Sequence, residues 1–115
     1  MAIHASIRGN IFIVQIDGDI NAHKAFEFES LLNMGIDDGL INIIFDFSAM
    51  THISSDGLHV ILKIIRILVP KHGIVLVVGM SKSVRSVFQA SGFLSLLEEF
   101  EAIEEAVAAI NDNID

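Results

Sequence analysis

The sequence predicts a single α/β domain in which helices cover a mostly parallel sheet. Short apolar segments of strand length alternate along the chain with longer segments whose apolar residues recur at helical spacing. Such alternation is typical of α/β folds. The length of 115 residues fits one domain, no Gly/Ser-rich linker divides it, and 52% hydrophobic residues suffice for a core. We therefore take residues 1–115 as one domain.

The N-terminal part of the chain is expected to form a hairpin and then a helix. Ile3–Ile7 and Ile11–Ile16 are the two expected strands, and the Gly-containing segment 8–10 is the turn between them. A helix is predicted over Ala22–Met34, because Phe28, Leu31 and Leu32 share one face, with Ala25 one turn earlier. Asn21 is suited to cap the start of that helix.

The middle of the chain predicts two central strands separated by a helix. Leu40–Phe47 and Gly73–Gly79 are nearly continuous apolar runs, which suit strands that are buried on both faces. Thr51–Asp56 is expected to be a polar loop. The helix that follows is predicted over Gly57–Val69, because Pro70 cannot continue it.

The C-terminal part predicts two helices and a short strand. Ser81 can cap a helix that ends near Gly92, a residue type common at helix ends. Leu94–Leu97 is the expected last strand, and Glu101–Asn111 is the expected last helix, with its apolar residues on one stripe.

Charge and cysteine content restrict the function. Fifteen acidic residues against seven basic ones give a net charge of -8, which disfavours nucleic acids and anionic membranes as partners. There is no Cys for a disulfide or thiolate site. No signal peptide is evident, and the longest apolar stretch, Leu58–Val69, is too short and too charged to insert into a membrane. We therefore expect a cytoplasmic protein.

The sequence offers no framework for catalysis. None of the five His residues lies in a metal-binding pattern, and phosphate-binding loops and nucleophile elbows are missing. Ser54, Ser55, Asp56 and His59 are close in sequence, but His59 lies one turn further along the same predicted helix, which is not the geometry of a catalytic triad. We expect no enzymatic activity, no cofactor and no metal site.

The most informative segment is the loop that leads into the second predicted helix. Ser54 or Ser55 can cap this helix, and Asp56 adds negative charge at the positive end of its dipole. Gly57 either allows a close backbone approach or leaves space for a partner. Helix capping and close packing are enough to explain these residues without a functional role.

The same loop resembles the signature of STAS domains, the sulfate-transporter and anti-sigma-factor-antagonist family. That family carries an Asp-Ser-Ser-Gly-Leu-Gly type sequence where this chain has Ser54-Ser55-Asp56-Gly57-Leu58-His59. Segments 18–21, 91–93 and 104–106 are also similar to family motifs, in the same order. The resemblance implies a mixed, mostly parallel sheet of four to five strands with helices packed mainly on one side.

The resemblance also implies a function. Antagonists of this family bind an anti-sigma factor that is also a serine kinase and carries the ATP, and phosphorylation of the Ser before the Gly ends binding. We therefore expect a regulatory protein of a bacterial partner-switching pathway, with that kinase as its partner. The alternative is a STAS subunit that serves as an interaction module in a transporter-associated or sensory complex.

Asp56 occupies the position where the family carries its phosphorylated Ser. Asp has one negative charge, whereas phosphoserine has about -1.5 to -2 and three acceptor oxygens, so Asp56 is a partial mimic of the modified state. Three alternatives remain: Ser55, or Ser54, accepts the phosphate; the chain is held in one state; or the phosphorylation switch has been lost and only the binding surface remains.

The second predicted helix has an unusually wide apolar arc. His59 and Lys63 belong to a narrow polar strip, and Leu58, Val60 and Ile64 lie on the apolar remainder. One interpretation is that neighbouring helices bury this arc. The other is a partner-binding surface beside the loop, with His59 and Lys63 at the rim and Val60 and Ile64 near the centre.

Overall fold

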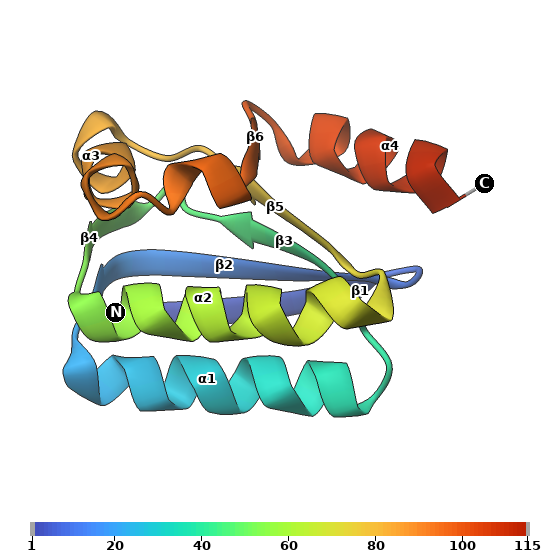
Figure 1. Cartoon of the computed structure of the whole chain (residues 1–115), viewed down its shortest axis with the longest axis horizontal. Coiled ribbons are helices and arrows are strands. Elements are labelled where there is room, and N and C mark those ends of the chain that lie inside the picture. The colour runs from blue at the N-terminus through green and yellow to red at the C-terminus, as the bar shows by residue number, and fades with distance from the viewer. Residues whose placement is uncertain (1, 115) are drawn as a thin grey trace.

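The computed structural model describes residues 2–114 and has the predicted α/β architecture, with a mixed, mostly parallel sheet and four helices (Figure 1). The strands are β1 (Ala2–Arg8), β2 (Ile11–Ile20), β3 (Asn42–Asp46), β4 (Met50–Ile53), β5 (Ile74–Val78) and β6 (Glu98–Phe100). The helices are α1 (Ala22–Asp37), α2 (Ser55–Leu68), α3 (Lys82–Ser91) and α4 (Ile103–Ile114), with short 3-10 turns η1 (Val69–Lys71) and η2 (Leu94–Leu96).

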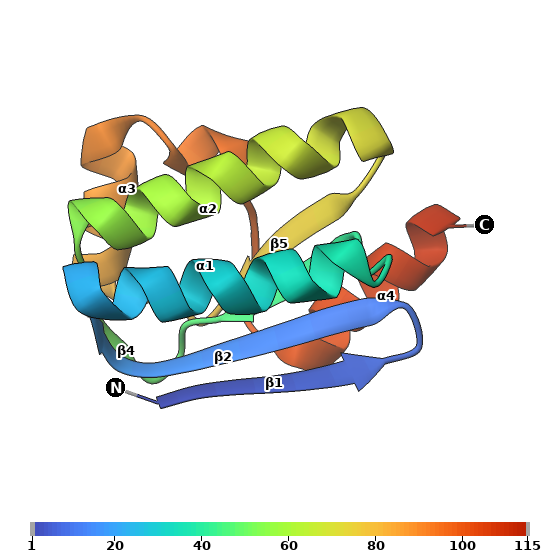
Figure 2. The ribbon, with the colours of Figure 1, turned by 90° about the horizontal axis from the view of Figure 1, so that it is seen from below.

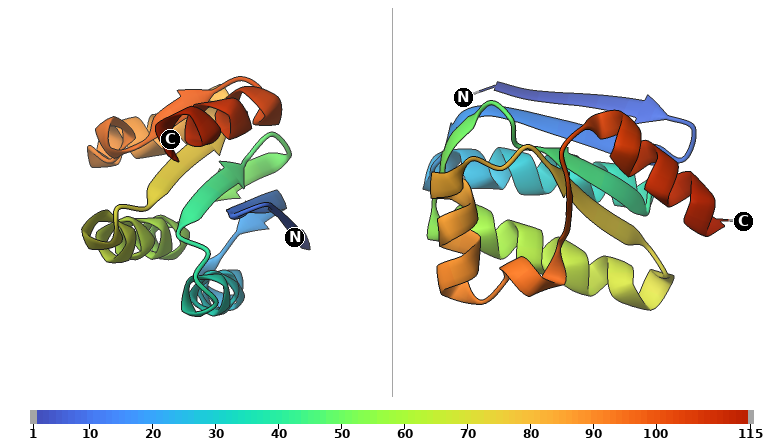
Figure 3. Two further views of the ribbon diagram at one scale, coloured as in Figure 1. Left: turned by 90° about the vertical axis from the view of Figure 1, so that its right-hand side faces the viewer. Right: turned by 90° about the horizontal axis from the view of Figure 1, so that it is seen from above.

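Helices lie on both faces of the sheet, most of them on one. The strand order is β1-β2-β3-β5-β6, and β4 pairs with the far end of β2. Side chains of α1, α2 and α3 share the large core on one face, while α4 covers the other face with a smaller cluster of its own (Figure 3). Both strands that were predicted to be central, β3 and β5, are inside the sheet, as expected.

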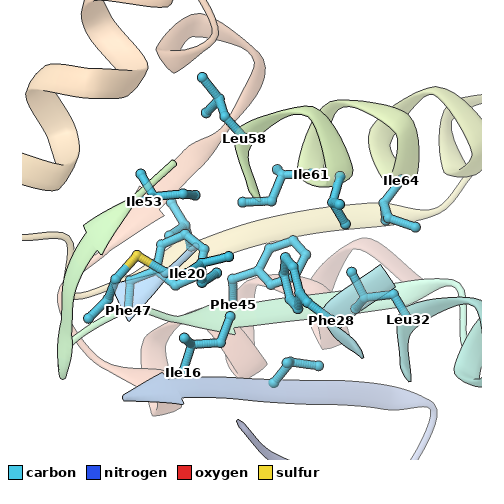
Figure 4. Packing of buried hydrophobic residues seen from close by; sticks show 14 of the residues in the cluster. Ile16, Ile20, Phe28, Leu32, Phe45, Phe47, Ile53, Leu58, Ile61 and Ile64 are labelled. Carbon is cyan, nitrogen blue, oxygen red and sulfur yellow. The ribbon is translucent and has the colours of Figure 1, made fainter. Parts of the chain in front are cut away.

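Aromatic side chains form the centre of the large core. Phe28 of α1 meets Phe45 of β3 edge-on with the ring centroids 5.7 Å apart, and Phe45 stacks on Phe47 at 5.6 Å. Phe47 in turn stacks on Phe88 of α3 at 6.3 Å. All four rings are fully buried, and the close view shows α2 residues such as Ile61 directed toward the same layer (Figure 4). This continuous packing connects the three helices to the sheet.

Strand β2 is longer than predicted because it pairs with two strands in succession. Its first half pairs in parallel with β3, and its end, Gly18–Ile20, pairs in parallel with β4. The register shifts between Gly18 and Asp19, where Gly18 has a φ of 84°, a conformation that favours glycine.

Strand β4 corrects the predicted loop Thr51–Asp56 and adds a sixth strand to the four or five expected. Only Met50 and Ile53 of this strand are buried, while the two residues between them are exposed. Two apolar residues in a four-residue strand are too few to reveal a period along the sequence. The strand forms because its backbone pairs with the end of β2.

The last strand lies directly after the predicted position Leu94–Leu97, which was wrong. Leu94–Leu96 form the turn η2, and the chain pairs with β5 through the short strand β6. Glu99 of β6 accepts a hydrogen bond from Arg85 of α3, which raises the pKa of the Arg85 guanidinium. Backbone pairing with β5 therefore makes a strand of a Glu-rich segment that hydrophobicity does not mark.

Predicted helix caps are confirmed by their hydrogen bonds. The side chain of Asn21 accepts from the Lys24 amide at 3.0 Å, and Ser81 Oγ accepts from the Val84 amide at 3.2 Å. Gly92 ends α3 with a φ of 82°. At the end of β3, the buried Asp46 accepts from the amide and the hydroxyl of Ser48, at 3.0 and 2.6 Å, and so shapes the turn toward β4.

Candidate functional site

The predicted loop Ser54–Gly57, which the structure shows as the N-cap and first turn of α2, lies at the edge of the sheet where the parallel strands end. Strands β2, β3 and β5 run in the same direction, so their carboxyl ends meet at this edge, a common position for functional sites in α/β proteins. Helices α1 and α2 run side by side and both begin here (Figures 1 and 2). The loop is thus placed next to the start of a second helix.

Hydrogen bonds anchor this loop to β2. The Ser54 amide donates to the Ile20 carbonyl at 2.9 Å, and the Gly18 amide donates to the Ala49 carbonyl at 2.8 Å just before β4. Ser54 Oγ accepts from the Gly57 amide at 3.2 Å. Of the two serines that could cap α2, Ser54 is therefore the cap, and Ser55 is the first residue of the helix.

Gly57 allows α2 to approach the sheet closely. A Cβ atom at this position would lie 2.7 Å from Cγ2 of Ile20 and 3.1 Å from Cγ1 of Ile53, both in the core beneath the helix. Gly57 is itself buried. The close-approach interpretation therefore holds, and the space at Gly57 is filled by the protein's own core rather than left for a partner.

The outer surface of the loop is polar and exposed to solvent. Ser55, Asp56 and His59 are exposed, and within residues 2–114 their side chains make no hydrogen bond or ion pair. Lys63, one turn beyond His59, pairs with Glu29 of α1 at 3.1 Å. The predicted polar strip is thus confirmed, and Lys63 connects the two helices along it.

The apolar side chains assigned to the predicted partner-binding surface are buried, which corrects that assignment. Leu58 and Val60 are 6% and 4% exposed, and Ile64 is fully buried. Ile64 points from α2 toward the layer that contains Phe28 and Leu32 (Figure 4). The arc is wide because α2 packs against α1 as well as the sheet. These residues belong to the core, and too little of their surface is exposed for them to form the apolar centre of an interface.

The apolar side chain that is exposed beside the loop belongs to α1 and was not anticipated. Phe26 is 75% exposed and borders a hollow of about 320 Å³ between the starts of α1 and α2. The residues lining this hollow are Ala22, Ala25, Phe26, Glu29, Asp56, His59, Val60 and Lys63. A signal was available in the sequence: Phe26 lies off the helix face that carries Phe28 and Leu32.

Removal of the Ser54 cap provides a test of the loop geometry. Ser54→Ala is expected to lower the free energy of unfolding by about 1 kcal/mol, because the Gly57 amide loses its acceptor. Ser55→Ala is the matched control and should change it by less than about 0.5 kcal/mol. Urea denaturation measures both, and equal effects of the two substitutions would contradict the assignment of the cap.

The described residues show no metal or membrane-spanning feature. Between residues 2 and 114, no group of three or more His, Asp or Glu side chains is arranged to hold a metal ion. In the same range, none of the helices combines the length and hydropathy that a bilayer span requires. What the fold and loop define is a small α/β domain with a firmly anchored, outwardly polar loop at a helix start.

Comparison with known proteins identifies the family of this domain. The family model described as "STAS domain" matches residues 2–106, and the chain belongs to the STAS domain family. A curated relative from Bordetella bronchiseptica, "Putative anti-sigma factor antagonist BtrV", is 31% identical over 99 residues, which are 86% of this chain and 85% of the relative.

Solved structures confirm the fold. The anti-sigma factor antagonist SpoIIAA in its unphosphorylated form superimposes with a TM-score of 0.88 at 21% identity, covering 96% of this chain and 97% of SpoIIAA. The Bacillus cell fate determinant SpoIIAA in its phosphorylated form gives a TM-score of 0.78 at 22% identity, covering 95% and 99%.

Proposed function

We propose that this protein is an anti-sigma factor antagonist that binds a serine kinase/anti-sigma factor in a bacterial partner-switching pathway. The observation that carries the proposal is the anchored loop, which presents Ser55 and Asp56 to solvent at the position of the family signature. Membership of the STAS family and the name of the Bordetella relative support it. Because the partner acts on the transcription machinery, the protein works in the cytoplasm, and ATP belongs to the partner.

The partner-binding surface in this proposal consists of the exposed groups of the loop and of the first turns of α2. Ser55 and Asp56 lie at its centre, and His59 and Lys63 form one rim. Ser54 and Gly57 contribute from below, the first by capping α2 and the second by its close packing on Ile20. Nothing in this arrangement requires catalysis by the chain itself.

Ser55 is the serine of this loop that is suited to accept a phosphate. Its hydroxyl is exposed and is not engaged within the described part of the chain. The hydroxyl of Ser54 is half-buried and accepts the Gly57 amide, so its modification would remove the helix cap. Asp56 supplies a fixed negative charge beside Ser55, so the loop of this chain is charged before any modification.

Charge reversal at Asp56 tests the proposed function. The parent chain should bind the purified serine kinase/anti-sigma factor of its own organism and release the bound sigma factor. Asp56→Lys should lower the affinity at least about tenfold in calorimetry, because it reverses the charge at the centre of the surface. Asp37→Lys changes the net charge equally, but lies in the last turn of α1 at the opposite end, and should bind like the parent.

Two results would contradict the proposal. One is that the parent chain neither binds the anti-sigma factor nor releases the sigma factor. The other is that Asp56→Lys binds as tightly as Asp37→Lys, which would place the interface away from the loop. Both variants change exposed positions, so circular dichroism should show parent-like folding.

A further inference from the structure

Phe26 is an aromatic side chain that the fold does not use. The face of α1 that packs on the sheet carries Ala25, Phe28 and Leu32, which are 4%, 0% and 0% exposed. Phe26 points away from these residues and is 75% exposed. A ring left in water contributes little to the stability of the domain. Because Phe26 contributes little to packing, we looked to binding of a partner for the role of its ring.

The surroundings of Phe26 connect it to the proposed partner-binding surface. The hollow it borders is also lined by Asp56, His59 and Lys63 of α2. Phe26 and the loop therefore share one surface, although Phe26 comes from a different helix and lies 30 residues before Asp56 in the sequence. Large aromatic residues at the centre of an interface, with polar groups around them, commonly contribute most of the affinity.

The charges around the hollow indicate what the partner must present. Lys63 and Glu29 pair with each other and so neutralise one another across the hollow. The Asp56 carboxylate has no such partner within the described residues. One net negative charge therefore remains beside the exposed ring, on a chain whose overall charge is -8. An interface that complements this surface has an apolar pocket with a basic rim.

We propose that Phe26 anchors the anti-sigma factor, with its ring in an apolar pocket of that partner and a basic residue of the partner facing Asp56. This inference rests on the proposed function and adds α1 to a surface that the sequence places on the loop and the start of α2. Phe26 would also help the protein to discriminate between partners, because a partner without a pocket for the ring could not pack closely against it.

Substitution of Phe26 tests the anchor. Phe26→Ala should lower the affinity for the purified serine kinase/anti-sigma factor at least about tenfold. Met34→Ala is the matched control, because Met34 is 65% exposed on the same helix but does not line the hollow. It should change the affinity by less than about twofold. Both variants should melt like the parent, since neither side chain is part of the core.

The outcomes separate this inference from the proposed function. If Phe26→Ala binds like the parent while Asp56→Lys loses affinity, the anchor is wrong and the proposed function stands. If Phe26→Ala and Met34→Ala lose affinity equally, the effect is not specific to the hollow and the anchor is also wrong. If the parent does not bind the anti-sigma factor, both fail. Affinity that falls with rising salt in the parent supports the basic rim.

Discussion

Ile64→Asp is expected to unfold the domain. Ile64 is fully buried between α2 and the aromatic layer of the core. A carboxylate there would have no cation to pair with and would lose its hydration, which is among the most destabilising changes a single substitution can make. We expect a loss of about 4 kcal/mol or more, against a total of about 5–15 kcal/mol for a typical domain. Thermal melting followed by circular dichroism measures the loss.

Ile67→Asp is the control for that experiment. Ile67 lies on the same helix, one turn beyond Ile64, but is 39% exposed, so its carboxylate can remain hydrated. This variant should stay folded and melt close to the parent. An Ile64→Asp protein that also stays folded would show that this face of α2 is open to solvent, as the docking interpretation of the sequence requires.

If the proposed function is right, Asp56→Ser is expected to turn the loop into a substrate for the serine kinase/anti-sigma factor. The substitution restores a hydroxyl at the position where the family signature carries its phosphorylated Ser. Asp56 is an exposed residue in the first turn of α2, and within residues 2–114 its side chain makes no hydrogen bond or ion pair that the substitution would break. With the cognate kinase and ATP, labelling of residue 56 should rise from none to nearly one phosphate per chain, as measured by mass spectrometry.

Asp56→Ala distinguishes a new acceptor from a merely altered charge. It removes the carboxylate without adding a hydroxyl, so residue 56 should remain unlabelled. Any phosphate on the parent chain is expected on Ser55, because the Ser54 hydroxyl caps α2. Phosphate found instead on a distant residue, such as Ser86 of α3, would refute the loop as the site of regulation.

The sequence could predict those parts of the fold in which the residues of one segment are enough to indicate its burial or its hydrogen bonds. Leu40–Phe47 and Gly73–Gly79 are apolar enough to require burial on both faces, and the structure places β3 and β5 inside the sheet. The caps at Asn21 and Ser81 are local, because each side chain bonds to a backbone amide three residues ahead. Both kinds of prediction were confirmed.

The parts that could not be predicted depend on contacts between distant segments. Strands β4 and β6 exist because backbone groups of β2 and β5 pair with them, and neither has a hydrophobic period of its own. For the same reason the sequence leaves two interpretations of Val60 and Ile64, since their burial depends on how α2 packs against α1 and the sheet. Phe26 was missed because its neighbours in the hollow come from another helix.

The anchoring of the loop has a consequence for the thermodynamics of association. Ser54 follows directly from β4, which is paired with β2, and residues 55–57 form the first turn of the 14-residue helix α2, so their backbone is ordered before a partner arrives. Ordering a residue on binding would cost about 1–2 kcal/mol each in conformational entropy. This surface avoids that loss, so the measured heat capacity change should reflect the area buried and not the folding of a segment.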